Sequence, residues 1–156
     1  MQENLDPLNT QMCDVLVIPL KKVVNARGHL MEIQRNDDEH FMGFGQAYVT
    51  NTLPGVIKAW YLHHEQWDQI TPVCGKAKAV LFDARPHSPT HGLVLEVWLN
   101  EEAPVLLRIP PGVWHGHMAV GDRSVYLLHL NSVPYRFDHV DEDRLDPDSS
   151  LIPYKW

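Results

Sequence analysis

Cysteine and basic residues are both scarce in this chain of 156 residues. Cys13 and Cys74 are its two cysteines, and no CxxC pair is present, which argues against a disulfide framework and favours a reducing compartment. The chain has 13 basic and 20 acidic residues, a net charge of −7, and no run of lysine or arginine. Nucleic acid and anionic membranes are therefore not expected as partners, whereas a few arginines in a cleft would still permit an anionic small ligand.

A secretion signal is also not recognisable at the start of the sequence. Residues 1–20 include Glu3, Asp6 and Asp14, and they contain neither a basic leader nor a long apolar stretch. Together with the cysteine usage, this pattern predicts a cytoplasmic protein.

Sustained helical periodicity is the third absence, because no stretch keeps a period of 3.6 residues for more than about three turns. Short apolar and β-branched runs are instead separated by Gly, Pro, Asn and Asp, as in all-β proteins. The length and the 44% apolar composition suit one domain, residues 1–156. The predicted strands are 13–19, 30–34, 45–51, 56–63, 69–74, 76–83, 94–99, 105–109, 116–120 and 125–131. From about residue 136 to 156 the chain is polar and acidic, which predicts an extension across the barrel surface.

The segment from Gly55 to Gly75 has the most informative spacing. In an extended strand alternate side chains share a face, so Tyr61 and His63 are expected to be neighbours that line one surface. The spacing resembles the first cupin motif, G(x)5HxH(x)4E(x)6G, with Tyr61 at the first histidine and Asp68 at the glutamate.

Three further motifs resemble those of the dTDP-4-dehydrorhamnose 3,5-epimerases and related sugar-nucleotide cupins. Residues 27–32 read RGHLME and are similar to RGxFxE, and residues 83–92 read DARPHSPTHG and are similar to DxRxxSPTxG. Residues 109–117 read IPPGVWHGH and are similar to IPxGxxHGF, and the ending from Asp146-Pro147 to Trp156 resembles the family's tail. The resemblance implies a cupin-type jelly-roll barrel that works as a homodimer.

The family's catalytic residues are not retained in kind when each is carried over. The histidine base falls at Tyr61, which has an unperturbed pKa near 10, and the lysine that stabilises the enolate falls at Asp68. The tyrosine acid falls at Leu128, counted forward from His115, and the late aspartate that orients the base falls beyond residue 156.

Substrate-binding positions match better. By the resemblance, Arg27 and Glu32 reach the nucleotide from the dimer partner, Gln46 contacts the ligand, and Lys58 replaces an arginine that meets the pyrophosphate. His115 also falls at a position that lines the binding cavity. Strict alternation places Lys58 on the face opposite Tyr61, so both reach one cavity only if the strand has a bulge or a twist. Arg85, beside Ser88 and Thr90, is interpreted as a structural residue that holds a long loop.

The first functional hypothesis is an isomerase of the carbohydrate epimerase class. It would transfer a proton next to the keto group of a dTDP-4-keto-6-deoxyhexose or a similar sugar nucleotide, as an epimerase or ketoisomerase without a cofactor. His63 would serve as the base, because its pKa suits proton removal, and Tyr61 as the acid or proton carrier.

Two alternatives remain open. His63, Asp68 and His115 form a two-histidine, one-carboxylate set that would hold a divalent metal such as iron, zinc or manganese. The third hypothesis is a barrel that binds a sugar nucleotide without converting it. The identity of the nucleotide, of the sugar and of the epimerised carbon depends on cavity shape, which the sequence does not reveal.

Overall fold

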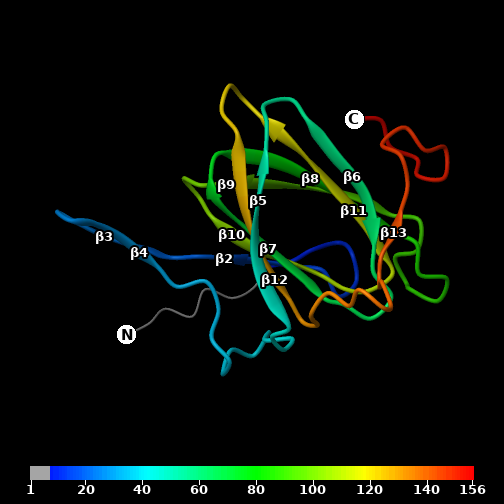
Figure 1. Ribbon diagram of the computed structural model, residues 1–156, viewed down its shortest axis with the longest axis horizontal. Helices are drawn as coiled ribbons and strands as arrows, with labels where there is room; N and C mark the ends of the chain where they lie inside the picture. The colour runs from blue at the N-terminus through cyan, green and yellow to red at the C-terminus, as the bar shows by residue number, and fades with distance from the viewer. Residues whose placement is uncertain (1–7) are drawn as a thin grey trace.

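Two antiparallel sheets face each other in the computed structural model, which describes residues 8–156 (Figure 1). One sheet has the strand order β1-β2-β10-β7-β12-β5 and the other β13-β6-β11-β8-β9, while β3 and β4 pair only with each other. This is the jelly-roll architecture predicted from the sequence, and residues 8–156 contain no helix. The strands are β1 Leu8–Asn9, β2 Leu16–Pro19, β3 Lys22–Asn25, β4 Gly28–Met31, β5 Gln46–Thr52, β6 Ile57–Leu62, β7 Asp68–Cys74, β8 Lys76–Asp83, β9 Val94–Asn100, β10 Val105–Ile109, β11 Val113–Val120, β12 Val125–Asn131 and β13 Asp143–Arg144.

The apolar core fills the space between the two sheets because alternate side chains of each strand point inward. Leu81 of β8, Leu107 of β10 and Leu127 of β12 have no exposed surface and belong to one cluster. The inward-facing polar residues of β6, β7 and β11 lie in another part of the interior, outside this apolar cluster.

The chain after β13 covers the outer side of the β6–β8 sheet. Ile152 packs with Trp60 and Val80, and the rings of Tyr154 and Trp156 lie against Trp60. The extension predicted from about residue 136 therefore does cross the barrel surface, and its last residues bury apolar side chains as well as polar ones. No helix within the described part of the chain is long and apolar enough to cross a membrane.

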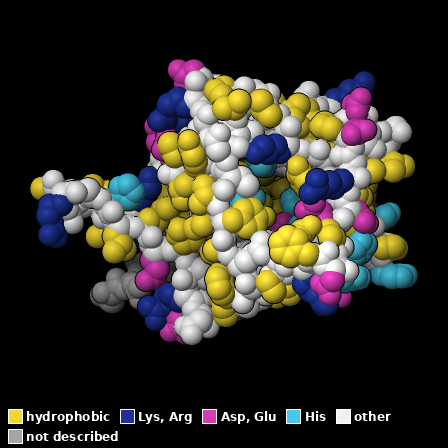
Figure 2. Space-filling view, viewed as in Figure 1, with side chains coloured by type: hydrophobic (Ala, Val, Ile, Leu, Met, Phe, Trp, Pro, Cys, Tyr) yellow, Lys and Arg dark blue, Asp and Glu magenta, His cyan; other side chains and the backbone are white. Residues whose placement is uncertain are grey.

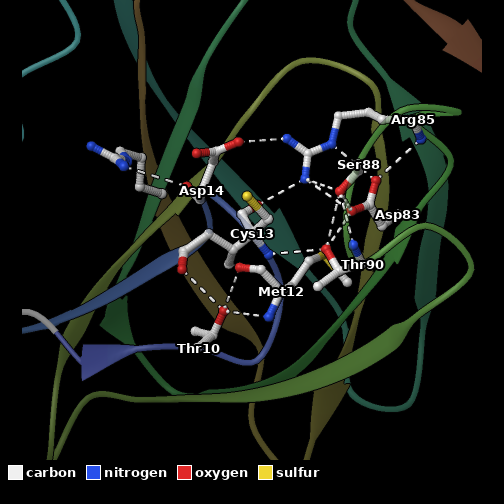
Figure 3. A network of polar contacts seen from close by, with 10 residues as sticks. Thr10, Met12, Cys13, Asp14, Asp83, Arg85, Ser88 and Thr90 are labelled. Carbon is white, nitrogen blue, oxygen red and sulfur yellow. Dashed lines mark hydrogen bonds and ion pairs between the residues drawn. The ribbon is translucent and has the colours of Figure 1, made fainter.

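The loop from Asp83 to Thr90 is tied to the N-terminal segment by Arg85 (Figure 3). The Arg85 guanidinium donates to Asp83 Oδ2 at 2.9 Å, to the Cys13 carbonyl at 2.8 Å and to Asp14 Oδ2 at 2.8 Å. Thr90 Oγ1 accepts a hydrogen bond from the Cys13 main-chain N–H at 3.0 Å. These contacts support the interpretation of Arg85 as a structural residue.

The β3–β4 hairpin projects away from the barrel (Figure 1). Its apolar side chains are open to solvent, with Val24 72% and Leu30 65% exposed. Arg27 lies in the turn of this hairpin, where its main-chain N–H donates to Asn25 Oδ1. Neither Arg27 nor the exposed Glu32 therefore lines the interior of its own barrel.

Candidate active site

A bulge in β6 brings Lys58 and Tyr61 to the same face of the sheet. Tyr61 pairs with His115 of β11 and Lys58 pairs with His117, so two residues of β6 oppose the single residue Gly116. Directly paired residues in antiparallel strands point to the same face, and both histidines point into the barrel. The condition under which Lys58 and Tyr61 would reach one cavity is therefore met.

Glycine is required opposite this bulge because the backbones approach each other closely. A Cβ atom on Gly116 would lie 2.4 Å from the Ala59 Cβ and 2.8 Å from the Ala59 Cα. The HGH motif thus supplies two inward histidines and, between them, the glycine that admits the bulge.

The centre of the site is a buried carboxylate between two imidazoles. Asp68 opens β7, and its Oδ2 lies 3.3 Å from His63 Nε2 and 2.9 Å from His115 Nε2. Its other oxygen, Oδ1, accepts a hydrogen bond from Gln66 Nε2 at 2.5 Å. All four side chains are buried, and the structure brings together the three residues that the cupin spacing predicted.

The charges in this cluster stabilise one another. Burial raises the pKa of Asp68, but the hydrogen bonds and charges of His115 and His63 outweigh burial and hold that pKa well below its usual range. Burial lowers the pKa of His63, but the hydrogen bond and charge of Asp68 outweigh it and raise the pKa to about 9. Asp68 is therefore ionised, and the positive charge of His63 opposes the repulsion that this carboxylate would otherwise exert on an anion formed in the site.

The second nitrogen of each imidazole faces a main-chain carbonyl. His63 Nδ1 donates to the Asp141 carbonyl at 2.5 Å, and His115 Nδ1 donates to the Val113 carbonyl at 3.1 Å. Each ring is thus held at both ends, which fixes its orientation.

Tyr61 lies at the edge of the cluster, half-buried. Its ring centroid is 6.5 Å from that of His115, and the guanidinium of Arg144 lies 5.6 Å above its ring centroid. Arg144 reaches this position because β13 pairs with β6, opposite Tyr61. A cation at this distance is attracted to the face of the phenol ring.

Two further histidines, which were not predicted as site residues, lie in the interior. His117 Nε2 lies 2.9 Å from Thr52 Oγ1, and His129 Nε2 lies 2.9 Å from Thr50 Oγ1. Burial, aided by neighbouring positive charge, lowers the pKa of His117 to about 3. Burial likewise lowers the pKa of His129 to about 4, so both rings are neutral at pH 7.

Leu128, where counting from His115 places the family's acid, does not face the interior of the barrel. Leu128 pairs with Val49 on the outer face of the sheet, whereas the neighbouring His129 points inward and stacks on Tyr48 with ring centroids 4.6 Å apart. Alternation from the core residue Leu127 would have identified His129 as the inward residue.

The remaining predicted binding residues lie at different parts of the molecule. Lys58 Nζ donates to the Asn51 carbonyl at 2.6 Å, and Gln46 pairs with the inward residue Asn131 and accepts from the Tyr135 N–H at 2.6 Å. Arg27 and Glu32 remain on or beside the projecting hairpin. Within one chain, the structure therefore joins His63, Tyr61, His115 and Lys58 but not Arg27 or Glu32.

The chemistry of the central cluster also suits a divalent metal. His63, Asp68 and His115 each offer one ligand atom, and these atoms lie within 4.8 Å of one another. Two imidazoles and a carboxylate are ligands that iron, zinc and manganese accept. The same atoms also satisfy one another as ion pairs, so the geometry is compatible with both states.

Comparisons with known proteins identify the family of the chain. A family profile described as dTDP-4-dehydrorhamnose 3,5-epimerase matches residues 9–156. The spore coat polysaccharide biosynthesis protein SpsL of Bacillus subtilis is 35% identical over 142 residues, which are 91% of this chain and 94% of that protein. The probable low-salt glycan biosynthesis epimerase Agl13 of Haloferax volcanii is 35% identical over 145 residues, which are 92% of this chain and 93% of that protein.

A solved structure gives the same result for the fold. The dTDP sugar isomerase from Desulfovibrio desulfuricans aligns with a TM-score of 0.88 at 30% identity, covering 93% of this chain and 92% of that one. Fold and sequence therefore agree over nearly the whole chain, and the resemblance inferred from the motifs is confirmed. The chain belongs to the dTDP-4-dehydrorhamnose 3,5-epimerase family, a family of sugar-nucleotide epimerases.

Proposed function

We propose that this protein is a sugar-nucleotide epimerase or ketoisomerase that transfers a proton next to the keto group of a dTDP-4-keto-6-deoxyhexose or a similar sugar. The observation that carries the proposal is the buried His63–Asp68 ion pair, with Tyr61 beside it on the same face of the barrel. The substrate class is supported by family membership and by the dTDP sugar isomerase among the similar structures.

His63 is the proposed base, and Asp68 is the group that stabilises the imidazolium formed when His63 takes a proton. A raised pKa makes His63 a strong proton acceptor in its neutral form. In that form the Gln66 amide, 3.3 Å from His63 Nε2, supplies a hydrogen-bond donor. Tyr61 is the proposed acid, which returns a proton to the sugar.

Binding of the nucleotide is assigned to cationic and polar residues around this centre. Lys58 faces the interior and offers one ammonium to a pyrophosphate, without the two-pronged geometry of an arginine. Gln46 and His115 line the proposed ligand site. Arg27 and Glu32 are proposed to contact the nucleotide bound by a second copy of the chain.

A homodimer is part of the proposal because the hairpin exposes apolar side chains that its own barrel leaves uncovered. Val24 and Leu30 are mostly exposed, and Val49, Val73 and Tyr126 are exposed on the neighbouring strands β5, β7 and β12. Figure 2 presents apolar side chains gathered on the barrel face beside the hairpin. Such surfaces are typical of protein interfaces. Light scattering should give twice the chain mass for the wild type, and Leu30→Glu should reduce it; a monomeric wild type would refute the dimer.

A cytoplasmic role in polysaccharide biosynthesis completes the proposal. Cys13 and Cys74 are free, as a reducing compartment allows. The relative SpsL is named for spore coat polysaccharide biosynthesis, and Agl13 for glycan biosynthesis.

A metal centre is the second candidate, because the ligand atoms of His63, Asp68 and His115 lie close together. A bound divalent ion would supply a Lewis acid that polarises the keto group. In that case the two histidines and the carboxylate would hold the ion, and Tyr61 would remain the side chain placed to transfer a proton.

The deciding experiment is incubation of the exhaustively chelated protein with dTDP-4-keto-6-deoxyglucose in heavy water, followed by mass spectrometry and NMR. Deuterium at carbon 3 or 5 of the sugar supports enolisation without a metal. Exchange that appears only after addition of iron, zinc or manganese supports the metal centre. Nucleotide-sugar binding without exchange under either condition would leave a binding protein and refute both catalytic proposals.

A further inference from the structure

The segment that precedes and forms β13 holds the loop between His63 and Asp68 through one side chain. The Asp141 carboxylate accepts three consecutive main-chain N–H groups, from His64 at 2.8 Å, Glu65 at 3.0 Å and Gln66 at 2.9 Å. Hydrogen bonds to an ionised carboxylate are stronger than those between neutral groups. This loop is therefore fixed by a residue that is distant in the sequence.

The main-chain carbonyl of the same residue accepts the Nδ1 proton of His63 at 2.5 Å. Asp141 thus makes two kinds of contact with residues 63–66. Its main-chain carbonyl binds the His63 ring, and its carboxylate binds the main chain of the turn that follows. When Nδ1 carries a proton and donates it to Asp141, Nε2 is the nitrogen directed toward Asp68.

The turn that Asp141 binds, residues 64–66, also places the Gln66 side chain beside Asp68 and His63. Gln66 provides the last of the three main-chain N–H groups that Asp141 binds, and its side chain donates to Asp68 Oδ1 at 2.5 Å and lies 3.3 Å from His63 Nε2. Movement of the turn would therefore displace both the His63 ring and the amide that bridges it to Asp68.

The surroundings of the Asp141 carboxylate favour its ionised form. Burial raises the pKa of Asp141, but the hydrogen bonds from the three main-chain N–H groups and the charge of His63 outweigh burial and lower that pKa. Replacement of the carboxylate by an amide would remove the charge and leave a poorer set of acceptors for the three N–H groups.

We propose that Asp141 is a positioning residue of this active site, which holds His63 and Gln66 in the orientation needed for proton transfer. The inference rests on the proposed function for its effect on turnover, but not for its effect on the geometry of His63. Asp141 acts through these two residues and does not touch the substrate.

The test compares Asp141→Asn and Asp141→Ala with Asp143→Asn, a control that makes the same change two residues along. Asp143 is mostly exposed, and its carboxylate bonds the exposed ring of His64 at 2.9 Å. Long-range proton–nitrogen NMR spectra report the protonated nitrogen of each imidazole, and His63→Ala identifies the His63 signals. Deuterium exchange into the sugar gives kcat and KM for each variant.

The expected result for Asp141→Asn is a change in the His63 ring signals and a fall in kcat of about 10- to 100-fold, with KM changed less than about threefold. Asp143→Asn should resemble the wild type in both measurements. If Asp141→Ala does not fold, Asp141→Asn keeps the shape of the side chain and decides alone.

Unchanged His63 signals in Asp141→Asn would overturn the inference. Changed signals with unchanged kcat would overturn it as well, since the orientation that Asp141 gives to His63 would then not be needed for proton transfer. If the wild type itself shows no exchange, the proposed function fails, and the NMR comparison alone decides whether Asp141 positions His63.

Discussion

Lys58 and Tyr61 are three residues apart on β6, yet their side chains lie on the same face of the sheet. The bulge between them, opposite Gly116, changes the alternation of the strand so that Lys58 pairs with His117 and Tyr61 with His115. The ammonium of Lys58 and the phenol of Tyr61 therefore both face the interior of the barrel. In a regular strand, two residues three positions apart would face opposite sides of the sheet.

Gly116→Ala should disturb this arrangement. The new Cβ would lie 2.4 Å from the Ala59 Cβ and 2.8 Å from its Cα, so one backbone must move. We expect a loss of about 2 kcal/mol in the free energy of unfolding, as for other overpacked sites, and weaker binding of dTDP. Urea unfolding and calorimetry measure the two effects. The double variant with Ala59→Gly should recover part of the stability, and a Gly116→Ala protein as stable as the wild type would contradict the bulge.

His63→Ala should abolish deuterium exchange in the chelated protein, because the variant lacks the imidazole that is proposed to take the proton from the sugar. Tyr61→Phe removes only the hydroxyl and should still permit exchange of a sugar proton while slowing formation of the epimerised product. Mass spectrometry measures exchange, and NMR measures the product. Exchange that persists in His63→Ala at the wild-type rate would exclude His63 as the base.

Turnover should rise with pH. The pKa of His63 is raised to about 9, so at pH 7 only about 1% of the protein has the neutral, proton-accepting form. We expect the initial exchange rate of the chelated enzyme to increase about tenfold per pH unit from pH 7 and to level near pH 9. Asp68→Asn should move this inflection to lower pH, because the burial of His63 is then less opposed. A rate that falls through pH 9 would mean that protonated His63 is the active form.

Asp83→Asn should destabilise the fold more than Asp14→Asn. Asp83 has no exposed surface and accepts hydrogen bonds from Arg85, Ser88 and Thr90. Asp14 is exposed and forms an ion pair with the same Arg85 guanidinium on its solvent side. We expect a loss of about 3 kcal/mol for Asp83→Asn and of less than about 1 kcal/mol for Asp14→Asn, measured by urea unfolding at pH 7. Equal effects would contradict the importance of the buried carboxylate.

The effect of Asp83 should also depend on pH. Burial raises its pKa, but the hydrogen bonds from Arg85, Ser88 and Thr90 outweigh burial and hold the pKa well below its usual range. The stabilisation is therefore fully present above the unfolded pKa of about 4 and is lost as pH falls toward the folded value. The difference in stability between the wild type and Asp83→Asn should shrink from pH 5 to pH 3.

Much of the barrel could be predicted from the sequence because its strands combine β-branched residues with clear turn signals. The predicted strands 76–83, 105–109 and 125–131 have the observed bounds, and the others differ by a few residues at their ends. β1, β3 and β13 were not predicted. β3 pairs only within an exposed hairpin and has no buried face, and β1 and β13 have only two residues each, which is too short for a recognisable hydrophobic pattern.

The site was predictable where it follows one strand and its turn, and less so where it depends on register or distance. His63, Asp68 and His115 were expected together from motif spacing and do meet. The inward His129 was missed because counting forward from His115 does not show which face of the next strand a residue occupies, and adjacent residues of a strand occupy opposite faces. Asp141 was missed because no local pattern marks a carboxylate that binds a loop elsewhere in the chain.

The contact between Asp141 and His63 joins residues that are 78 positions apart. Closing a loop of this length costs conformational entropy before the contact can form. During synthesis, the ribosome completes β6, β7 and β11 before it adds the residue that orients the His63 ring. A nascent chain that still lacks Asp141 therefore has His63, Asp68 and His115 without the contact that holds the His63 ring, and on the proposed function we expect proton transfer only after the segment around Asp141 has docked.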